Sequence, residues 1–182
     1  MTPCRVHLTG ASGTGTTTLG RALASAWSVP HADTDDYFWV PTTPAYTTKR
    51  EEPERLRLMH ELFVGRSAWV LSGSLIGWGD SLIDSFDAVI FLSVDHDARM
   101  ERLRERERVR YGSAIDTGGE LEVAHREFMD WAGGYEDPDT DGRNRAQHES
   151  WLAALRCPVL RLDSTRPTDD LVAEILSRGA HA

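Results

Sequence analysis

The chain has 182 residues, of which 40% are hydrophobic and 27% are charged, and its formal net charge is −9. This length supplies one well-buried core more readily than two, so we expect a single domain over residues 1–182. The acidic balance argues against a nucleic-acid polymer or an acidic membrane surface as partner, because proteins that bind polyanions collect Lys and Arg.

Short apolar runs alternate with amphipathic segments along the chain. This alternation predicts an α/β fold in which helices cover a parallel sheet of five strands. The expected strands are residues 5–9, a short strand ending near 31–35, and residues 68–72, 88–94 and 158–163. The expected helices are residues 17–27, 51–66, about 97–108, 120–131 and 143–155, and a closing helix from residue 168.

A glycine-rich segment, LTGASGTGTTTL at residues 8–19, lies between the first expected strand and the first expected helix. Gly10 and Gly15 have the spacing of the phosphate-binding loop G-x-x-x-x-G-K-[ST], and Thr17 has its hydroxyl position. Thr16 stands where the lysine belongs. Glycines let successive backbone N–H groups converge on phosphate oxygens, and the helix N-terminus adds positive potential.

We therefore expect this loop to bind nucleotide phosphates, with Thr17 also binding Mg²⁺. The expected binding residues are Gly10, Ala11, Ser12, Gly13, Thr14, Gly15, Thr16, Thr17 and Thr18. The alternative is a strand-to-helix turn whose glycines serve packing alone.

Two carboxylates, Asp33 and Asp35, follow the second expected strand in the sequence HADTDD. Ligands bind at the carboxyl ends of the strands in open α/β sheets, so these side chains should face the ligand crevice. We expect them to bind an acceptor hydroxyl, to act as general base or to hold Mg²⁺, with Asp35 favoured for both acceptor and metal. The alternative is that they only cap the next helix.

The acceptor-binding region is expected at about residues 33–66. Its segment DDYFWVPTTPAYTTKR has aromatic side chains beside Lys49 and Arg50, a composition that suits a stacked ring and an anion. The alternative is a hydrophobic plug over the sheet edge. The glycines of SGSLIGWGD at residues 72–80 suit either close approach to a substrate or a tight crossover.

Phosphoryl transfer needs cations around the phosphates. The expected ones are Arg110, which stands just before the expected break of the charged helix, and Arg143 or Arg145, because a guanidinium binds phosphate in a bidentate way. Arg106 joins them through the family resemblance described below. Most other charges of ERLRERERVR are expected to form a solvated helix face with pairs at i,i+4. His148, like His125, lacks ligand spacing and is expected to be hydrogen-bonded or solvent-facing.

The chain resembles the P-loop kinases of small molecules and nucleoside monophosphates, such as adenylate, cytidylate and shikimate kinases. GASGTGTTTLGRALA resembles their loop and first helix, and AVIFLSVDHDARMERLRERER has their R-L-x-x-R pattern at Arg102, Leu103 and Arg106. VLRLDSTRPTDDLVAEIL resembles their last strand, adenine-side loop and last helix. The resemblance implies a three-layer P-loop fold, a helical lid at about residues 108–143, and ATP and Mg²⁺ as cofactors.

The same resemblance implies that Arg102, Asp163 and Arg166 lie beside the nucleotide. Two departures from the family pattern bear on function. Thr16 replaces the lysine that normally reaches the β- and γ-phosphates, so the lid arginines would have to supply that charge. Ser72 ends the third expected strand where nucleoside monophosphate kinases usually have an aspartate, whereas shikimate kinase-like members use carboxylates after strand two.

The sequence thus predicts ATP- and Mg²⁺-dependent transfer of the γ-phosphoryl group to a small-molecule or nucleoside monophosphate acceptor. The alternatives are a catalytically degenerate nucleotide-binding protein and a slow NTPase. Cys4 and Cys157 form neither a disulfide framework nor a zinc motif. No signal peptide or long apolar run is recognisable, so a soluble cytoplasmic protein is expected, with its oligomeric state left open.

Overall fold

The structure is a computed structural model and describes residues 1–178. Its five strands are all parallel and lie in the order β2-β3-β1-β4-β5. Their bounds are β1 Arg5–Gly10, β2 His31–Asp33, β3 Trp69–Ser72, β4 Ala88–Ser93 and β5 Val159–Asp163. The predicted α/β fold with a five-stranded parallel sheet is confirmed.

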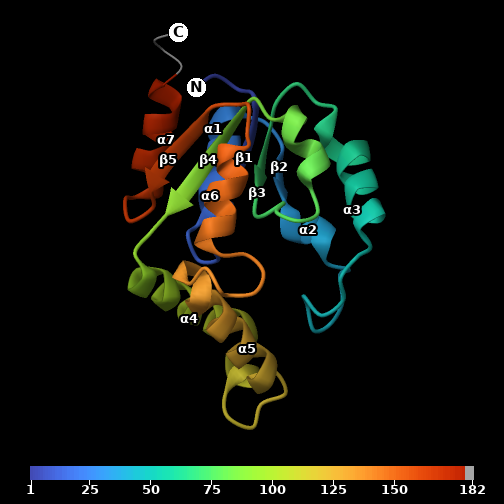
Figure 1. The fold of residues 1–182 in the computed structure, drawn as a ribbon, viewed down its shortest axis with the longest axis vertical. Helices are drawn as coiled ribbons and strands as arrows, with labels where there is room; N and C mark the ends of the chain where they lie inside the picture. The colour runs from blue at the N-terminus through green and yellow to red at the C-terminus, as the bar shows by residue number, and fades with distance from the viewer. Residues whose placement is uncertain (179–182) are drawn as a thin grey trace.

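Helices follow the strands in the expected order (Figure 1). The α-helices are α1 Thr16–Trp27, α2 Thr34–Phe38, α3 Glu52–Met59, α4 His96–Tyr111, α5 Glu122–Gly133, α6 Arg145–Ala153 and α7 Thr168–Ser177. The helix expected over residues 51–66 is α3, continued by the π-helical turn η1 His60–Val64. The 3₁₀ segments are η2 Asp80–Ser85, η3 Gly112–Ile115 and η4 Gly134–Glu136.

Two apolar cores lie on the two faces of the sheet, because successive strand side chains point to opposite faces. Leu8 and Ile90 belong to the core that packs against α1 and α7. Leu71 and Phe91 belong to the core that packs against η1, α3 and α6. Burial on both faces explains why the central strands are continuous apolar runs, and it gives the molecule three layers.

The carboxyl ends of the strands face α4 and the segment that projects beyond it (Figure 1). This segment, predicted as the lid, contains η3, α5 and η4. Met100 and Leu103 of α4 pack with Ala132 of α5 in a small core of their own. The position of α5 is therefore tied to α4, which lies directly over the functional edge of the sheet. Within residues 1–178, no helix is both long and apolar enough to cross a bilayer.

Candidate nucleotide and acceptor site

The glycine-rich loop runs from the end of β1 at Gly10 to the start of α1 at Thr16. Gly13 and Gly15 have φ angles of 91° and 90°, in the left-handed region that favours glycine. A Cβ on Gly10 would lie 2.5 Å from the carbonyl oxygen of Leu92, so the loop also needs glycine where it passes β4. Thr14 Oγ1 braces the turn by donating to the Ala11 carbonyl oxygen at 2.8 Å.

The N-terminus of α1 has no side-chain cap, since its N-cap residue is Gly15. The N–H groups of the first helical turn, which begins with Thr16 and Thr17, have no intrahelical acceptor. Free N–H groups and the positive end of the helix form a ready site for an anion. The exposed Thr18 lies in this turn as well. The loop therefore has the geometry that phosphate binding requires, and the residues present fit a nucleotide.

Thr17 is joined to the end of β2 by a short hydrogen bond. Its Oγ1 donates to Asp33 Oδ2 at 2.7 Å, and Ser72 Oγ donates to the same oxygen at 3.4 Å. His31 Nε2 lies 2.8 Å from Ser72 Oγ and is the last member of this series of hydrogen bonds. A threonine hydroxyl whose proton is directed to a carboxylate has its lone pairs free for a cation.

The predicted metal pair was Thr17 and Asp35, whereas the carboxylate that contacts Thr17 is Asp33. Asp33 also caps α2, because its Oδ1 accepts from the Asp35 N–H at 3.1 Å. Within the described residues, no cluster of three His, Cys, Asp or Glu side chains is arranged to hold a metal by itself. Mg²⁺ at Thr17 would accordingly draw further ligands from phosphate oxygens and water, as this ion does in phosphoryl-transfer sites.

Arg143 brings a positive charge to the loop from the segment before α6. Its Nη2 donates to Ser12 Oγ at 2.7 Å, and its guanidinium stands 5.3 Å from the ring centroid of Trp131. Its Nε is enclosed and has no hydrogen-bond partner in the described chain, where Arg143 also forms no ion pair. Burial lowers the pKa of Arg143, and the charge of Asp35 opposes that shift.

An enclosed guanidinium that pairs with no carboxylate of residues 1–178, beside a glycine-rich loop at a helix N-terminus, is suited to an anionic ligand. Between the two arginines that the sequence left open here, the structure brings Arg143 to the loop. Arg145 turns away and pairs with Glu136 on the surface.

Arg99 is a second cation at the loop, and the sequence analysis missed it. Only 1% of its surface is exposed, and its Nη1 donates to the carbonyl oxygen of Ser12 at 3.3 Å. A Cβ on Gly13 would lie 2.9 Å from the Arg99 carbonyl oxygen, so α4 packs directly on the loop. The signal was the four-residue spacing of Arg99 and Leu103, which places both on the buried face of α4.

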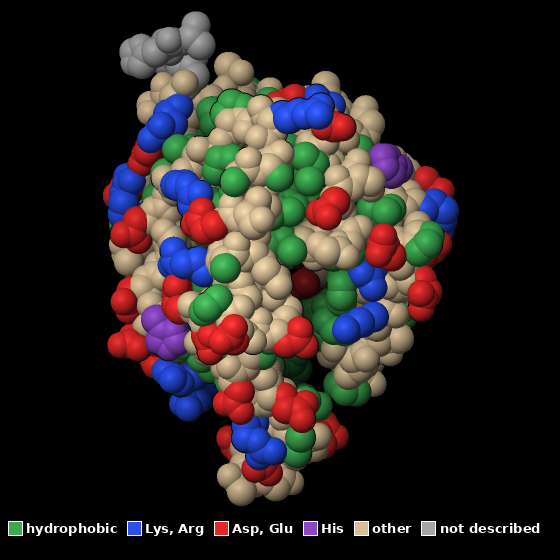
Figure 2. All heavy atoms as spheres, in the orientation of Figure 1, with side chains coloured by type: hydrophobic (Ala, Val, Ile, Leu, Met, Phe, Trp, Pro, Cys, Tyr) green, Lys and Arg blue, Asp and Glu red, His purple; other side chains and the backbone are tan. Residues whose placement is uncertain are grey.

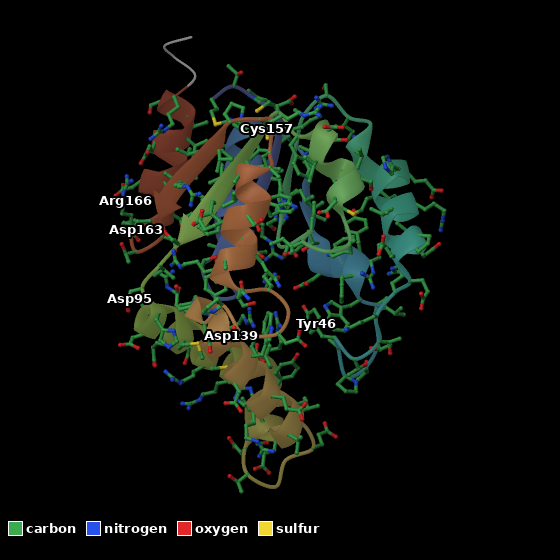
Figure 3. The ribbon with its side chains drawn as sticks, viewed as in Figure 1. Tyr46, Asp95, Asp139, Cys157, Asp163 and Arg166 are labelled. Carbon is green, nitrogen blue, oxygen red and sulfur yellow. The ribbon has the colours of Figure 1, made fainter. Side chains whose placement is uncertain are left out.

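The two predicted lid arginines stand at the far end of α4. Arg106 donates from Nε and Nη2 to Glu107 Oε1, at 3.0 and 2.8 Å. Arg110 places its guanidinium 4.7 Å from the ring centroid of Tyr46, which belongs to the loop after α2. Tyr46 lies on the side of that loop that faces the lid (Figure 3). Arg110 thus connects the lid to the acceptor region.

Asp35 is the carboxylate that faces these cations. Its side chain is exposed within the cleft, where partial loss of solvent raises the pKa of its carboxyl, and the charge of Asp33 adds to this shift. Arg143, Arg106 and Arg110 oppose the shift, in that order. A carboxyl with a raised pKa is a better proton acceptor, and this one lies between the phosphate-side cations and the acceptor region. Figure 2 shows the molecular face hollowed between the lid side and the α2–α3 side.

The aromatic segment after Asp35 divides into a part that packs on the core and a part that does not. Tyr37 and Phe38 are partly buried and pack against the core on the α3 side, as a plug would. Trp39 instead meets Tyr46 edge-on, with ring centroids 6.1 Å apart, at the rim of the cleft. Arg50 holds the segment in place by donating to the carbonyl oxygens of Tyr37 and Trp39, at 2.9 and 3.2 Å.

Arg55 of α3 is a buried cation in the acceptor region that the sequence analysis also missed. Its guanidinium lies 3.9 Å from the ring centroid of Phe38 and 5.3 Å from that of Trp78, and 8% of the residue is exposed. Its Nε donates to the Arg50 carbonyl oxygen, and it forms no ion pair with any carboxylate of residues 1–178. The signal was its four-residue spacing from the buried Met59.

The residues expected beside the nucleotide base are not all brought together. Arg102 donates from Nη2 to the Ser164 carbonyl oxygen at 2.8 Å, so it ties α4 to the loop after β5. Asp163 accepts from the Thr165 N–H at 2.9 Å and is exposed. Arg166 pairs with Glu174 of α7 on the outer flank, as Figure 3 shows.

Two buried histidines lie behind the phosphate-side loop. His148 Nδ1 lies 2.9 Å from the Tyr135 hydroxyl, and its Nε2 lies 3.3 Å from Thr9 Oγ1 of β1. His7 Nδ1 lies 3.2 Å from the Leu71 carbonyl oxygen. Burial lowers the pKa of both histidines to about 3. His148 therefore connects β1 to the segment that follows α5.

No family model matches the sequence. The chain is 42% identical over 171 residues to the uncharacterized protein YqaC of Bacillus subtilis strain 168, and the match covers 94% of each chain. A shikimate kinase from Acinetobacter baumannii, solved with shikimate, superposes with a TM-score of 0.56 at 17% identity, over 97% of this chain and 92% of that one. A gluconokinase from Sinorhizobium meliloti 1021 superposes with a TM-score of 0.53 at 19% identity, over 96% and 90%. The predicted resemblance to P-loop kinases is thereby confirmed for the fold.

Proposed function

The chain belongs to the same family as YqaC, and on the P-loop kinase fold that it adopts we propose that it is an ATP- and Mg²⁺-dependent phosphotransferase. In this proposal the γ-phosphoryl group is transferred to a small acceptor that has a hydroxyl or phosphate as nucleophile. A small acidic metabolite and a nucleoside monophosphate are the two acceptor classes considered.

One observation supports this function most directly. Arg143 donates to Ser12 of the loop, yet its Nε is enclosed without a partner, and no carboxylate of residues 1–178 forms an ion pair with it. Burying such a charge is costly unless an anion binds beside it. A loop with free N–H groups lies against it, and phosphate is the anion that this combination would suit. Together with Arg99, this arginine would supply the charge that Thr16 lacks.

The roles on the donor side follow from the contacts. The loop N–H groups would hold the phosphates, and Thr17, kept in orientation by Asp33, would bind Mg²⁺. The metal would neutralise phosphate charge when bound. Arg143 and Arg106 would stabilise the negative charge that develops on the transferred group. Enclosure by the lid would keep water away from this group.

The roles on the acceptor side rest on Asp35 and Arg55. Asp35 would orient the acceptor and receive its proton, a role that suits the raised pKa of its carboxyl. Arg55 would bind a carboxylate or phosphate of the acceptor, because its guanidinium is buried beside the rings of Phe38 and Trp78 and pairs with no carboxylate of the described residues. Both acceptor classes carry such a group.

The first experiment is a calorimetric titration with a non-hydrolysable ATP analogue, with and without Mg²⁺. We expect micromolar binding that Mg²⁺ strengthens. Asp33→Asn should remove most of the strengthening by Mg²⁺, because Thr17 loses the carboxylate that orients its hydroxyl. Asp36→Asn, three residues along, is the matched control and should keep it. Absence of binding up to millimolar analogue would reject the proposal.

The second experiment follows ADP release in the presence of an acceptor panel of nucleoside monophosphates and small hydroxylated acids. Turnover that depends on one acceptor class supports the proposal and names that class. ATP hydrolysis that is unaffected by any acceptor would instead identify a slow NTPase. Binding of the analogue without turnover toward any acceptor would identify a nucleotide-binding protein without transferase activity.

A further inference from the structure

Glu107 is a buried carboxylate in the contact between α4 and α5, and no role has yet been given to it. It lies four residues after Leu103 and eight after Arg99, on the face of α4 that is buried. Only 5% of its surface is exposed. Carboxylates are rarely buried unless they are paired, so its partners indicate its purpose.

The partners of Glu107 are the lid arginines. Its Oε1 accepts from Arg106 Nε at 3.0 Å and from Arg106 Nη2 at 2.8 Å, and Arg110 Nη1 lies 3.9 Å from the same oxygen. Its Oε2 lies 3.9 Å from His125 Nδ1 of α5. One carboxylate thus lies between Arg106, which the proposed function assigns to the transferred phosphoryl group, and Arg110, which connects the lid to the acceptor region.

The guanidinium of Arg106 is held on two sides. Glu107 binds one edge of it, and Phe128 of α5 lies 5.5 Å from it at the ring centroid. A guanidinium has five N–H donors, and two of them serve Glu107. The other three stay available to a ligand, with the plane of the group already set by the carboxylate and the ring.

We propose that Glu107 is a positioning residue that orients Arg106, and by its charge also Arg110, toward the phosphates bound at the loop. The catalytic effect of Glu107 rests on the proposed function. The contact between Glu107 and Arg106 does not, because it is present in the protein without ligand. Glu107 also separates two like charges that would otherwise repel each other at the end of α4.

The consequence for kinetics is a split between kcat and KM. Removing the charge of Glu107 makes the site more positive, so ground-state attraction for ATP should not weaken. Removing its hydrogen bonds frees Arg106 to leave the orientation that the transition state needs. Glu107→Gln should therefore lower kcat on the order of tenfold without raising KM for ATP. Glu105→Gln, on the exposed side of the same helix, is the matched control and should change neither constant.

The contact is tested first in the free protein, by NMR of the arginine Nε–H groups. We expect one slowly exchanging Nε–H resonance that disappears in Arg106→Lys, which assigns it. It should lose its protection in Glu107→Gln and keep it in Glu105→Gln. A resonance unchanged in Glu107→Gln overturns the inference whatever the protein catalyses. If Glu107→Gln does not fold, Glu107→Met removes the buried carboxylate without leaving a polar group in its place.

The functional test is a double-mutant cycle on turnover. If Glu107 acts through Arg106, Glu107→Gln should cost less than about twofold in kcat when added to Arg106→Ala. A penalty that persists undiminished in that background would show that Glu107 serves only the packing of α4 and α5, and would overturn the inference. If the wild type transfers no phosphoryl group, the proposed function fails, and the NMR comparison still decides whether Glu107 positions Arg106.

Discussion

On the phosphate side of the cleft, Arg99 and Arg143 reach Ser12 from two different elements, and left-handed glycines fix the loop between them. On the acceptor side, Arg55 lies 3.9 Å from the ring centroid of Phe38, and Tyr46 at the rim is more than a third exposed. The first arrangement is set by backbone and buried charge, and the second by side chains of α2, of α3 and of the loop that carries Tyr46. A rigid donor site suits a constant donor, whereas a site of side chains is where acceptor preference can be adjusted.

The largest expected effect tests whether the glycine-rich loop depends on Arg143, the cation that the segment before α6 contributes. Arg143→Ala should lower kcat by about 10²–10³-fold, the loss typical of a removed transition-state donor. Arg145→Ala is the matched control, because Arg145 pairs with Glu136 on the surface. Steady-state turnover with saturating acceptor measures both. Equal activities in the two variants would contradict the role given to Arg143.

The next effect tests the acceptor side alone. Arg55→Met should raise KM for the acceptor about 10- to 100-fold, because a charge-assisted hydrogen bond contributes about 1.5–3 kcal/mol. Affinity for the ATP analogue should stay unchanged. Arg57→Met, on the same helix, removes an exposed arginine that pairs with Glu54 and Glu61 and should be silent. A loss of ATP affinity in Arg55→Met would contradict the assignment of Arg55 to the acceptor alone.

The free energy of unfolding should decrease in acid because His7 and His148 are buried. Their pKa is lowered to about 3, below the unfolded value near 6.5, so the unfolded chain binds more protons between these values. Stability is then present above pH 6.5 and should fall as the pH drops below it, by about 1.4 kcal/mol per pH unit for each histidine.

Urea unfolding at pH 7, 6 and 5 measures this slope. His7→Phe should flatten it, since the ring would keep its stacking on Phe86 without a titrating group. His60→Gln, at an exposed position, should leave the slope as in the wild type. A slope that is the same in all three proteins would show that the buried histidines do not set the acid limit.

The smallest expected effect concerns Thr16. If Arg99 and Arg143 already supply the charge at the loop, Thr16→Lys should change kcat by less than about threefold or lower it through repulsion. Turnover at saturating ATP measures the change. A gain on the order of 10²-fold would contradict this account and would show that the natural loop lacks a charge it needs.

The sheet and the loop could be predicted because their signals are local. Continuous apolar runs report strands buried on both faces, and the glycine spacing reports a loop whose backbone conformation few other residues allow. The aromatic segment was harder to interpret, because Phe38 packs against the core whereas its neighbour Trp39 meets Tyr46.

The buried charged residues could not be predicted with the same reasoning. Arg99, Arg55 and Glu107 each lie four residues from a buried apolar side chain, but charged residues at that spacing usually lie on a solvated face. Which of Asp33 and Asp35 contacts Thr17 depends on the residue at which β2 ends. β2 ends at Asp33 and α2 begins at Thr34, so Asp33 becomes both the cap and the partner of Thr17.

The position of Arg143 bears on how much ATP the protein would hydrolyse when no acceptor is bound. A lysine in the loop would accompany every bound ATP molecule, whether or not an acceptor had arrived. Arg143 belongs to the connection between α5 and α6, so its charge reaches Ser12 only while that connection is seated. Under the proposed function, Arg143 would contribute its charge to the phosphates only in the state in which the connection between α5 and α6 closes the site. A protein built in this way would hydrolyse little ATP while idle, and the loss of the lysine would then act as a safeguard against futile turnover.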